Sequence, residues 1–562
     1  ATGRGIVAVF APSGYACGYP WSALRARASA LHPRGSRNVP RSNLIVGEAP
    51  VACKDERGCA ILNVESAGSE EVRLKSLPRG GDLFCSGPSG QLVSESFGML
   101  HLFNTISRRD EEFVPLNPPN VGLYTCGPTV YSYIHIGNLR TFLFEDLLRR
   151  YLKFKGFKVT QVMNVTDIDD KTIKGANEEG ISLGEFTSRF TRAFFEDISA
   201  VGIELAEHYP RATEHIGDMV SLIGRILRNG YAYESDGSIY FDVSKFKPYG
   251  ALTGVKPTLC QVRSRVDRDE YEKQDIRDFA LWKAAKPGEP SWDTELGTGR
   301  PGWHIECSAM SMRYLGETFD IHTGGVDNMF PHHENEIAQS RAATGKPLAR
   351  YWLHSEHLLM DRSKMAKSAG NIYTLREITA MGYEPRQVRY FLLSAHYRKQ
   401  LNFSLDALQQ AAGPLARIDG FVRSLRSASC SNSDGPAVAQ SISECEREFE
   451  AAMDDDLNIS EAMGVFFTFI RSVNELMHGG EISENDRSSI ESLLERINSV
   501  VGVIELGEEV ELSQEEDELI KMRREARRSR DWAYADRLRE QLRDRGIIIE
   551  DTKDGIRIKR LQ

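Results

Sequence analysis

Four residues from separate parts of this chain have side chains of the types that bind a soft metal ion. His332 and Glu336 are spaced i and i+4, so they would share one face of a helix, one turn apart. Cys307 lies upstream and offers a thiolate, and Cys126 is a candidate for a fourth ligand. Sulfur, imidazole and carboxylate together are ligands that a tetrahedral zinc ion takes, and sulfur favours zinc over harder cations.

Each of these residues alone has a simpler explanation. A lone Cys307 is more often a buried structural thiol, and His332 with Glu336 could form a surface pair. The combination with Cys126 favours the metal site. His333 could equally supply the imidazole on spacing grounds, and only its distance to Glu336 disfavours it.

Two short segments carry residues that could bind a triphosphate. His135 and Asn138 lie in a turn that joins a predicted strand to a predicted helix, a layout in which helix amides face a phosphate. Lys364 and Lys367 lie in a basic loop much later in the chain. Alone, the histidine would usually cap or pack, and the loop would be a solvated turn. Together, these groups could stabilise charge during in-line attack at an α-phosphorus, with a substrate carboxylate as the nucleophile.

A third candidate is the basic segment that contains Arg527 and Trp532. A solvated amphipathic helix explains it equally well. An aromatic side chain beside an arginine cluster is also what stacking on an unpaired base requires.

Length and composition limit the kinds of fold that can position these residues. A chain of 562 residues predicts several domains, and its nine cysteines favour reduced thiols over a disulfide framework. A net charge of -10 argues against a general polyanion binder. No apolar run is long enough to predict a transmembrane helix.

The alternation of strand and helix patterns predicts an α/β fold with a parallel, Rossmann-like sheet and ligands at the carboxyl ends of its strands. An insertion interrupts the sheet, and a helical bundle and a small C-terminal α+β domain follow it. The predicted divisions are 1–98, a poorly structured N-terminal extension; 99–200, the first half of the catalytic domain; 201–300, the insertion; 301–384, the second half with the lysine loop; 385–507, the bundle; and 508–562, the C-terminal domain.

Residues 1–98 differ in composition from the rest of the chain. They contain no acidic residue before Glu48 and several arginines, which is typical of an organellar transit peptide. The alternative interpretation is an unstructured leader, or upstream sequence read as protein, and Met99 is then a plausible start of the working protein.

Five motifs resemble those of class I cysteinyl-tRNA synthetases of bacterial type, in both order and spacing: 126–131, 135–138, 302–310, 330–336 and 364–368. The resemblance runs from about Met99 to the C-terminus. It implies ATP, with Mg²⁺, as a substrate, L-cysteine and tRNA-Cys as partners, a monomer, and a cytoplasmic location unless 1–98 direct the chain to an organelle. It also implies one zinc ion per chain, held by Cys126, Cys307, His332 and Glu336, which takes the thiol of substrate cysteine.

That zinc has a physical purpose. An apolar pocket would reject serine by only about 10²-fold, whereas a zinc–thiolate bond discriminates further without an editing domain. The resemblance assigns the remaining roles as follows: catalysis to His135, Asn138, Lys364 and Lys367; ATP binding to His135, Gly137, Asn138, Gly324, Gly325, Asp327 and Lys367; substrate binding to Thr166, Trp303 and His322; and tRNA binding to Arg527, Trp532, Asp536 and Asp551.

Two positions depart from the usual signatures. Asn138 stands where class I enzymes have histidine, and Ala366 stands where serine is usual. Asparagine can still donate to a phosphate oxygen, so we expect activity to survive. The predicted function is ATP-dependent ligation of cysteine to tRNA. The alternatives are a cysteine:amino-sugar ligase of the mycothiol type, which would lack an anticodon reader, and a non-catalytic zinc- and RNA-binding relative.

Overall fold

The computed structural model describes residues 52–55, 58–66, 72–76, 99–254, 277–360, 363–364, 372–428, 430, 436–480, 482–506, 513–528, 531–552 and 555–560. Only the backbone is described for 52–55, 58–66, 72–76, 363–364, 514, 528, 550–552 and 555–560. The chain divides into two units, 1–96 and 97–562, which are treated separately below.

The N-terminal unit contains a three-stranded antiparallel sheet in the order β1-β2-β3, formed by β1 (Ala52–Asp55), β2 (Gly58–Ser66) and β3 (Val72–Ser76). The predicted extension 1–98 lies mostly outside the described residues, and these three strands are the part of it that is described. The short strands contain β-branched residues such as Ile61, Val64 and Val72, but they lie among glycine and proline residues that obscure the strand pattern.

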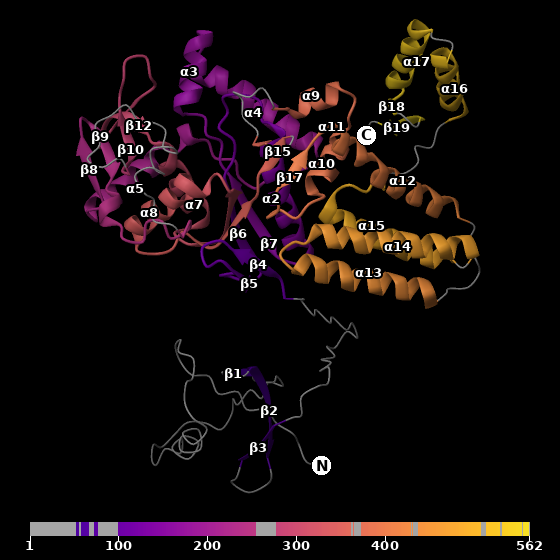
Figure 1. Ribbon diagram of the computed structural model, residues 1–562, viewed down its shortest axis with the longest axis horizontal. Helices are drawn as coiled ribbons and strands as arrows, with labels where there is room; N and C mark the ends of the chain where they lie inside the picture. Colours follow the sequence, from indigo (N-terminus) through magenta and orange to yellow (C-terminus); the bar gives the residue numbers. More distant parts are fainter. Residues whose placement is uncertain are drawn as a thin grey trace, which may run out of the picture. The chain divides into compact units, whose positions relative to one another are not determined.

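A parallel sheet forms the centre of the second unit and confirms the predicted Rossmann-like core (Figure 1). Its order is β14-β13-β6-β7, with every neighbouring pair parallel. Segments far apart in sequence therefore meet at one sheet edge. The strands are β6 (Asn120–Thr125), β7 (Lys158–Met163), β13 (Phe319–Gly325) and β14 (Ala349–Ser355), and a hairpin of β4 (His101–Asn104) and β5 (Arg109–Glu112) precedes them.

Three of the helices around this sheet, α2, α7 and α8, have mostly buried residues, whereas α3 and α4 are more exposed. In α2, apolar side chains such as Leu139, Leu143 and Leu147 pack into the main hydrophobic core. That core continues into the later helices, so the part with the parallel sheet and the helical bundle share one apolar interior. The helices of this part are α2 (Ile136–Phe154), α3 (Asp170–Glu179), α4 (Leu183–Ala200), α7 (Trp303–Leu315) and α8 (Glu334–Thr344), with a kinked π-helical turn, η3 (Met329–His333), before α8.

The insertion contains a five-stranded antiparallel sheet in the order β11-β12-β10-β9-β8. Its strand β9 pairs with both β8 and β10. The elements are η1 (Ala212–Glu214), α5 (Ile216–Arg228), β8 (Ala232–Ser235), β9 (Ser238–Phe241), η2 (Val243–Lys245), β10 (Phe279–Ala284), β11 (Trp292–Thr294) and β12 (Gly297–Pro301).

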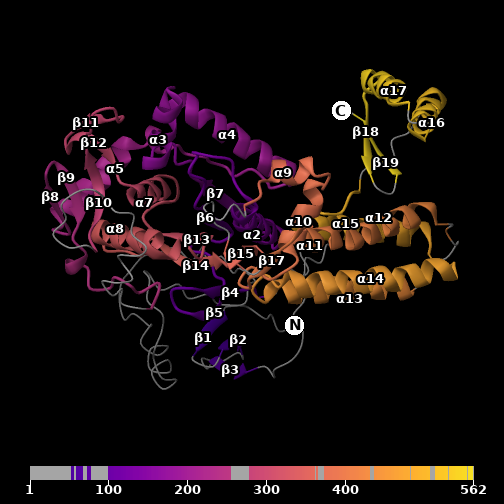
Figure 2. The ribbon, with the colours of Figure 1, turned by 45° about the horizontal axis from the view of Figure 1, so that its top comes forward.

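A helical bundle follows, in which α13 and α14 run side by side (Figure 2). Residues 385–507 also contain one strand, β17. This strand pairs in parallel with β15, which lies before the bundle in the sequence. The elements are β15 (Leu358–Met360), β16 (Ser363–Lys364), α9 (Leu375–Ala380), α10 (Pro385–Leu393), β17 (Leu401–Phe403), α11 (Leu405–Gln410), α12 (Ala412–Ser427), α13 (Pro436–Asp454), α14 (Ile459–Gly479) and α15 (Glu484–Val501).

The C-terminal part contains two helices, although the sequence pattern indicates one basic helix. They are α16 (Gln514–Arg528) and α17 (Trp532–Asp544), and Asp531 caps the second by accepting from the backbone N–H of Tyr534. Two antiparallel strands, β18 (Ile547–Thr552) and β19 (Gly555–Arg560), follow these helices, as the predicted α+β character of this part requires. None of the described helices has the length and apolar character needed to cross a membrane.

One buried carboxyl in α2 leads to a pH-dependent prediction. Burial raises the pKa of Glu145 to about 8, although the Thr323 hydroxyl donates a 2.9 Å hydrogen bond to it. The folded chain therefore holds a proton that the unfolded chain releases above its ordinary pKa of about 4.5, and stability falls as the pH rises from about 4.5 towards 8.

The substitution Glu145→Gln keeps an acceptor for Thr323 and removes this titration. We expect its thermal unfolding midpoint to match that of the wild type at pH 5 and to exceed it by about 2 °C or more at pH 8. Differential scanning calorimetry at the two pH values measures this. An equal offset at both would contradict the prediction.

Candidate metal centre and active site

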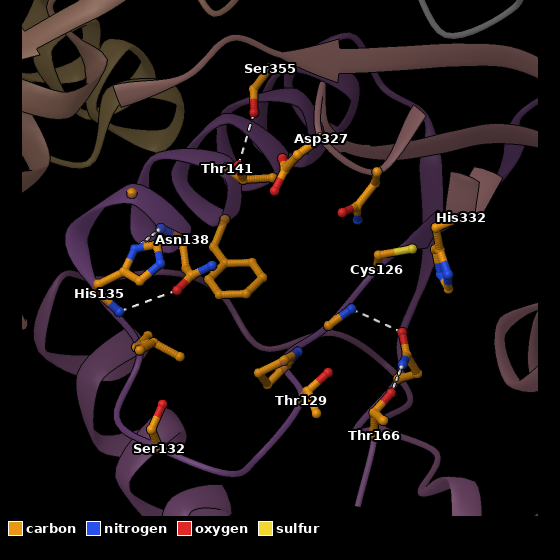
Figure 3. A pocket seen from close by; sticks show the side chains of 18 of the residues that line it. Cys126, Thr129, Ser132, His135, Asn138, Thr141, Thr166, Asp327, His332 and Ser355 are labelled. Carbon is orange, nitrogen blue, oxygen red and sulfur yellow. Dashed lines mark hydrogen bonds between the residues drawn. The ribbon is translucent and has the colours of Figure 1, made fainter. Parts of the chain in front are cut away.

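A cavity of about 340 Å³ lies where the carboxyl ends of the parallel strands meet. In an open α/β sheet this is the edge at which ligands bind. Figure 3 shows Cys126 and His332 at one end of the cavity and His135, Asn138 and Asp327 towards the other. Thr166 lies on the side of Cys126 and His332, and a backbone bridge joins it to Thr129. The cavity therefore has two chemically different ends.

The four predicted metal ligands converge at one end of this cavity. Cys126 follows β6, Cys307 comes from α7, His332 lies in η3, and Glu336 lies in the first turn of α8. One ligand atom from each lies within 4.8 Å of the other three, and all four residues are buried. Two sulfurs, an imidazole and a carboxylate fit the donor set that zinc prefers.

A second set of four overlaps the first and contains His322 and His333 together with Cys126 and Glu336. Cys126, Cys307 and His332 all line the cavity, whereas neither His322 nor His333 does. A metal ion that meets a substrate must face the cavity. The set with Cys307 and His332 is therefore the better candidate.

The protonation of these side chains also suits a cation. Burial raises the pKa of the Cys126 thiol, with Cys307 adding to the rise. For Cys307, a hydrogen bond with Cys126 lowers the pKa, but burial and Glu336 outweigh it and the net pKa is raised. Burial lowers the pKa of His332 to about 3, so its imidazole is neutral. A dication would supply the positive charge that lets both buried sulfurs ionise.

Histidines and aromatic side chains surround the four ligands. The Trp303 indole stacks on the His332 ring at 4.4 Å, and His304 lies 2.9 Å from His332 between Nδ1 atoms. His322 approaches Oε2 of Glu336 at 3.0 Å and stacks on Trp352. These contacts fix the orientations of His332 and Glu336, as is usual around metal ligands.

A hydrogen-bonded chain of buried side chains lies beside the metal ligands. The Thr166 hydroxyl donates to Glu306 at 3.0 Å, and the Asn164 amide donates to that same hydroxyl at 3.1 Å. The backbone N–H of Gly127 donates to the Asn164 side chain. A Cβ at Gly127 would lie 1.7 Å from the carbonyl oxygen of Asn164, so only glycine fits there. Cys126 is thereby held against the end of β7.

At the other end of the cavity, His135 and Asn138 form a reciprocal cap on α2. His135 Nδ1 accepts from the backbone N–H of Asn138 at 3.1 Å, and Asn138 Oδ1 accepts from the backbone N–H of His135 at 3.2 Å. Asparagine is well suited to this arrangement, which explains structurally how it can occupy the position. Both residues line the cavity at a helix N-terminus, where an anion is stabilised.

The other residues predicted for ATP binding lie at this end or behind it. Gly137, Gly325 and Asp327 line the cavity. Gly324 is buried, and a Cβ there would lie 2.7 Å from the His333 ring, so its role is to allow close packing. Lys364 lies in β16, of which only the backbone is described, and Lys367 lies outside the described residues.

The structure places the three residues predicted to bind the amino acid in different positions. Thr166 and Trp303 line the cavity, on the side of the metal ligands. His322 is fully buried behind Glu336 and does not line it. It contacts Glu336, one of the predicted metal ligands, at 3.0 Å.

Of the residues predicted to contact tRNA, Arg527 and Trp532 lie together. The guanidinium carbon of Arg527 lies 5.4 Å from the centroid of the Trp532 ring, and the indole is 55% exposed. Asp536 is exposed on α17. Asp551 lies in β18, opposite Ile556, and only its backbone is described. The pair offers an exposed ring and a cation to an unpaired base.

The sequence analysis did not identify several residues that line the cavity. Most follow the carboxyl ends of strands, and the rule that ligands bind there could have found Asn164 after β7 and Ser355 at the end of β14. The side chain of Ser355 lies 2.9 Å from that of Thr141, across two elements. The lining residues that lie outside the five motifs and carried no assigned role are Ser132, Tyr133, Ile134, Thr141, Phe142, Asn164, Lys171, Asn328, Ser355, Glu356, His357 and Leu358.

Comparison with known families accounts for most of the second unit. Residues 112–413 match the model of the class I (C) tRNA synthetase catalytic domain. Residues 448–506 match the DALR domain, and residues 509–558 match the cysteinyl-tRNA ligase anticodon binding domain. The order of the three matches is the order of the parts described above.

Curated relatives match over nearly their whole length. A cysteine–tRNA ligase of Solibacter usitatus is 47% identical, over 82% of this chain and 99% of that protein. One of Brachyspira hyodysenteriae is 45% identical, over 82% and 98%. Among solved structures, the Mycobacterium tuberculosis methionyl-tRNA synthetase bound by methionyl-adenylate is similar with a TM-score of 0.51 at 14% identity, covering 68% of this chain and 92% of that one. This last likeness concerns the fold.

Proposed function

The chain belongs to the cysteine–tRNA ligases, which are class I aminoacyl-tRNA synthetases, and from this premise we propose how its residues perform the two steps of the reaction. In the first step, the carboxylate of L-cysteine attacks the α-phosphate of ATP, giving cysteinyl-adenylate and pyrophosphate. In the second, a ribose hydroxyl at the 3′ end of tRNA attacks the adenylate carbonyl and releases AMP. The observation that carries the proposal is the buried quartet of Cys126, Cys307, His332 and Glu336 at one end of the cavity.

We assign these four residues to a single zinc ion. When bound, the zinc would supply a soft Lewis-acid site for the substrate thiolate, which serine cannot match. Trp303 covers His332 and reduces its contact with water, and His322 holds the second oxygen of Glu336. The chain's own contribution is thus an oriented, water-poor ligand set.

Thr166 lies beside this quartet and faces the cavity. Its hydroxyl proton is directed to Glu306, and Asn164 donates to the same oxygen, so the hydroxyl is held in place on two sides. A fixed hydroxyl at this position can accept a hydrogen bond from the substrate ammonium group. This orients the cysteine carboxylate towards the opposite end of the cavity.

His135 and Asn138 are assigned to the phosphates of ATP. The backbone N–H of each residue donates to the side chain of the other, and these two hydrogen bonds fix both residues at the start of α2. Charge that builds on the α-phosphate during attack would meet preorganised donors and the positive end of the helix. Lys364 and Lys367 are assigned to the same transition state, and Mg²⁺ accompanies the ATP. Gly137, Gly325 and Asp327 are assigned to the nucleotide.

We assign recognition of the tRNA anticodon to Arg527, Trp532, Asp536 and Asp551. The match of 509–558 to an anticodon-binding family model supports this assignment, as do the exposed indole and its neighbouring guanidinium. The same match disfavours a cysteine:amino-sugar ligase, which needs no such reader. We further propose a monomer in the cytoplasm, or in an organelle if 1–98 act as a targeting segment.

Charging tests the proposal as a whole. Zinc-replete protein is incubated with ATP, labelled cysteine and tRNA that carries the anticodon GCA, with and without prior chelation. We expect labelled aminoacyl-tRNA that disappears on chelation and returns on addition of zinc. Cysteine-dependent pyrophosphate exchange without charging would instead favour the amino-sugar acceptor, and neither reaction in folded protein would favour the non-catalytic alternative.

A further inference from the structure

The reaction has three substrates, but the assignments above use only two ends of the cavity. One end receives the amino acid and the other receives ATP. The terminal nucleotide of tRNA must also enter, because its ribose hydroxyl attacks a carbonyl between those two ends. Four of the lining side chains are exposed and mark where the cavity opens: Tyr133, Lys171, Trp303 and Asp327.

Lys171 is the only lysine or arginine that lines the cavity, within the residues the structure describes. It lies in the first turn of α3, five residues after Thr166, and its backbone N–H donates to the side chain of Asp169. Its ammonium lies 5.3 Å from the centroid of the Tyr131 ring. Tyr131 in turn is fixed beside the end of β7, because the neighbouring Val130 donates to the Thr166 carbonyl.

The two carboxylates that precede Lys171 are hydrogen-bonded to groups other than its ammonium, although attraction to Lys171 opposes the rise that burial causes in the pKa of Asp169. Asp170 is paired with Lys283 at 2.9 Å and with Arg300. Asp169 caps α3 through its contact with the backbone of Lys171. In the described part of the chain, no carboxylate lies within 4.0 Å of the Lys171 ammonium. The opening of the cavity therefore carries a cation whose charge is available to a ligand.

On these grounds we infer that Lys171 and Tyr131 receive the unpaired 3′ end of tRNA, with the ammonium on a phosphate of the terminal nucleotides and the ring against a base. This inference rests on the proposed function of the cavity. Single-stranded RNA ends are bound in this way, by cations that follow the backbone and aromatic rings that stack on bases. Lys171 is thus a positioning residue for the second step, and Trp303, which stacks on His332, is an exposed lining residue on the side of the predicted metal ligands.

The phosphate that Lys171 meets could come from tRNA or from ATP. The position of Lys171 favours tRNA, because it follows Thr166, on the amino-acid side, whereas His135 and Asn138 stand at the opposite end. The two sources predict different kinetics. A contact with tRNA affects transfer alone, and a contact with ATP affects the formation of the adenylate.

The substitution Lys171→Ala in the full chain tests this, with Lys174→Ala as the matched control. Lys174 lies one turn further along α3, is 75% exposed and pairs loosely with Glu178. Two assays are compared: cysteine-dependent ATP–pyrophosphate exchange without tRNA, and single-turnover transfer from preformed adenylate at increasing tRNA concentrations.

For Lys171→Ala we expect about a tenfold lower efficiency of transfer, less than threefold change in exchange, and partial rescue by Lys171→Arg. Transfer should also depend less on salt. In a plot of the logarithm of transfer efficiency against the logarithm of salt concentration, we expect the slope to become shallower by about 0.7. Lys174→Ala should behave as wild type in all three measurements.

Two results would overturn the inference. Transfer and salt dependence that match those of wild type would remove Lys171 from the tRNA path. An equal loss in exchange, with a raised KM for ATP, would place Lys171 on the triphosphate. Wild-type protein that fails to catalyse exchange at all would instead refute the proposed function, which keeps the two failures distinct.

Discussion

Cys307→Ser is expected to lower zinc affinity by two orders of magnitude or more and to abolish the preference for cysteine over serine. Cys307 is 1% exposed and supplies one of only two sulfurs in the quartet. A serine hydroxyl is a hard, weakly acidic donor, so the site would lose the softness that favours zinc. Loss of a single partner that merely orients a metal ligand costs about 10- to 100-fold, and loss of a ligand should cost more.

The measurements are zinc content per chain after dialysis and the rates of cysteine- and serine-dependent pyrophosphate exchange. Cys445→Ser is the matched control, because Cys445 is also buried but lies in α13, away from the cavity. It should retain zinc and selectivity even if it melts at a lower temperature. A zinc-loaded, cysteine-selective Cys307→Ser protein would remove Cys307 from the ligand set.

His135→Asn is expected to lower pyrophosphate exchange by about a hundredfold while leaving the fold intact. His135 has two separable roles in the structure, since it caps α2 and also lines the cavity. Asparagine is a good N-cap, so the helix should keep its start, whereas the imidazole that faces the phosphates is lost. Loss of one preorganised group that stabilises developing charge costs roughly 10² to 10³ in rate.

Thermal unfolding separates the two roles of His135. His135→Asn should unfold near the wild-type temperature, and His135→Ala should unfold lower by an amount that reflects about 1 kcal/mol of capping. Both should lose exchange to a similar degree, with zinc content unchanged. Exchange at the wild-type rate in His135→Asn would show that the residue only caps the helix.

The sequence predicted much of the site because its motifs lie at fixed places in a parallel sheet. Cys126 and Thr166 follow strands whose ends meet, and the i, i+4 spacing of His332 and Glu336 survives as a 3.2 Å contact even though η3 is kinked at Phe330. In each case the local sequence pattern and the sheet topology place the residue at the same end of the cavity. The choice between His332 and His333 needed the cavity, because both can reach Glu336 and Cys126 in overlapping sets.

Other features depended on tertiary contacts that no local pattern contains. Lys171 lines the cavity only because the segment before α3 folds back against residues 129–131. The pairing of β17 with β15 joins the bundle to the catalytic part, and the break before Trp532 needed the cap from Asp531 to be recognised. Residue type alone could not distinguish a basic helix from two helices with a turn.

X-ray absorption at the zinc edge, on purified full-length protein with and without substrate, tests the central claim most directly. The account predicts zinc near one equivalent per chain, with sulfur, nitrogen and oxygen neighbours, and one additional sulfur neighbour when L-cysteine is added but none when L-serine is added. Protein that charges tRNA with cysteine but holds no zinc, or whose zinc gains no sulfur neighbour from cysteine, would contradict the assignment of Cys126, Cys307, His332 and Glu336 as the site that selects the substrate.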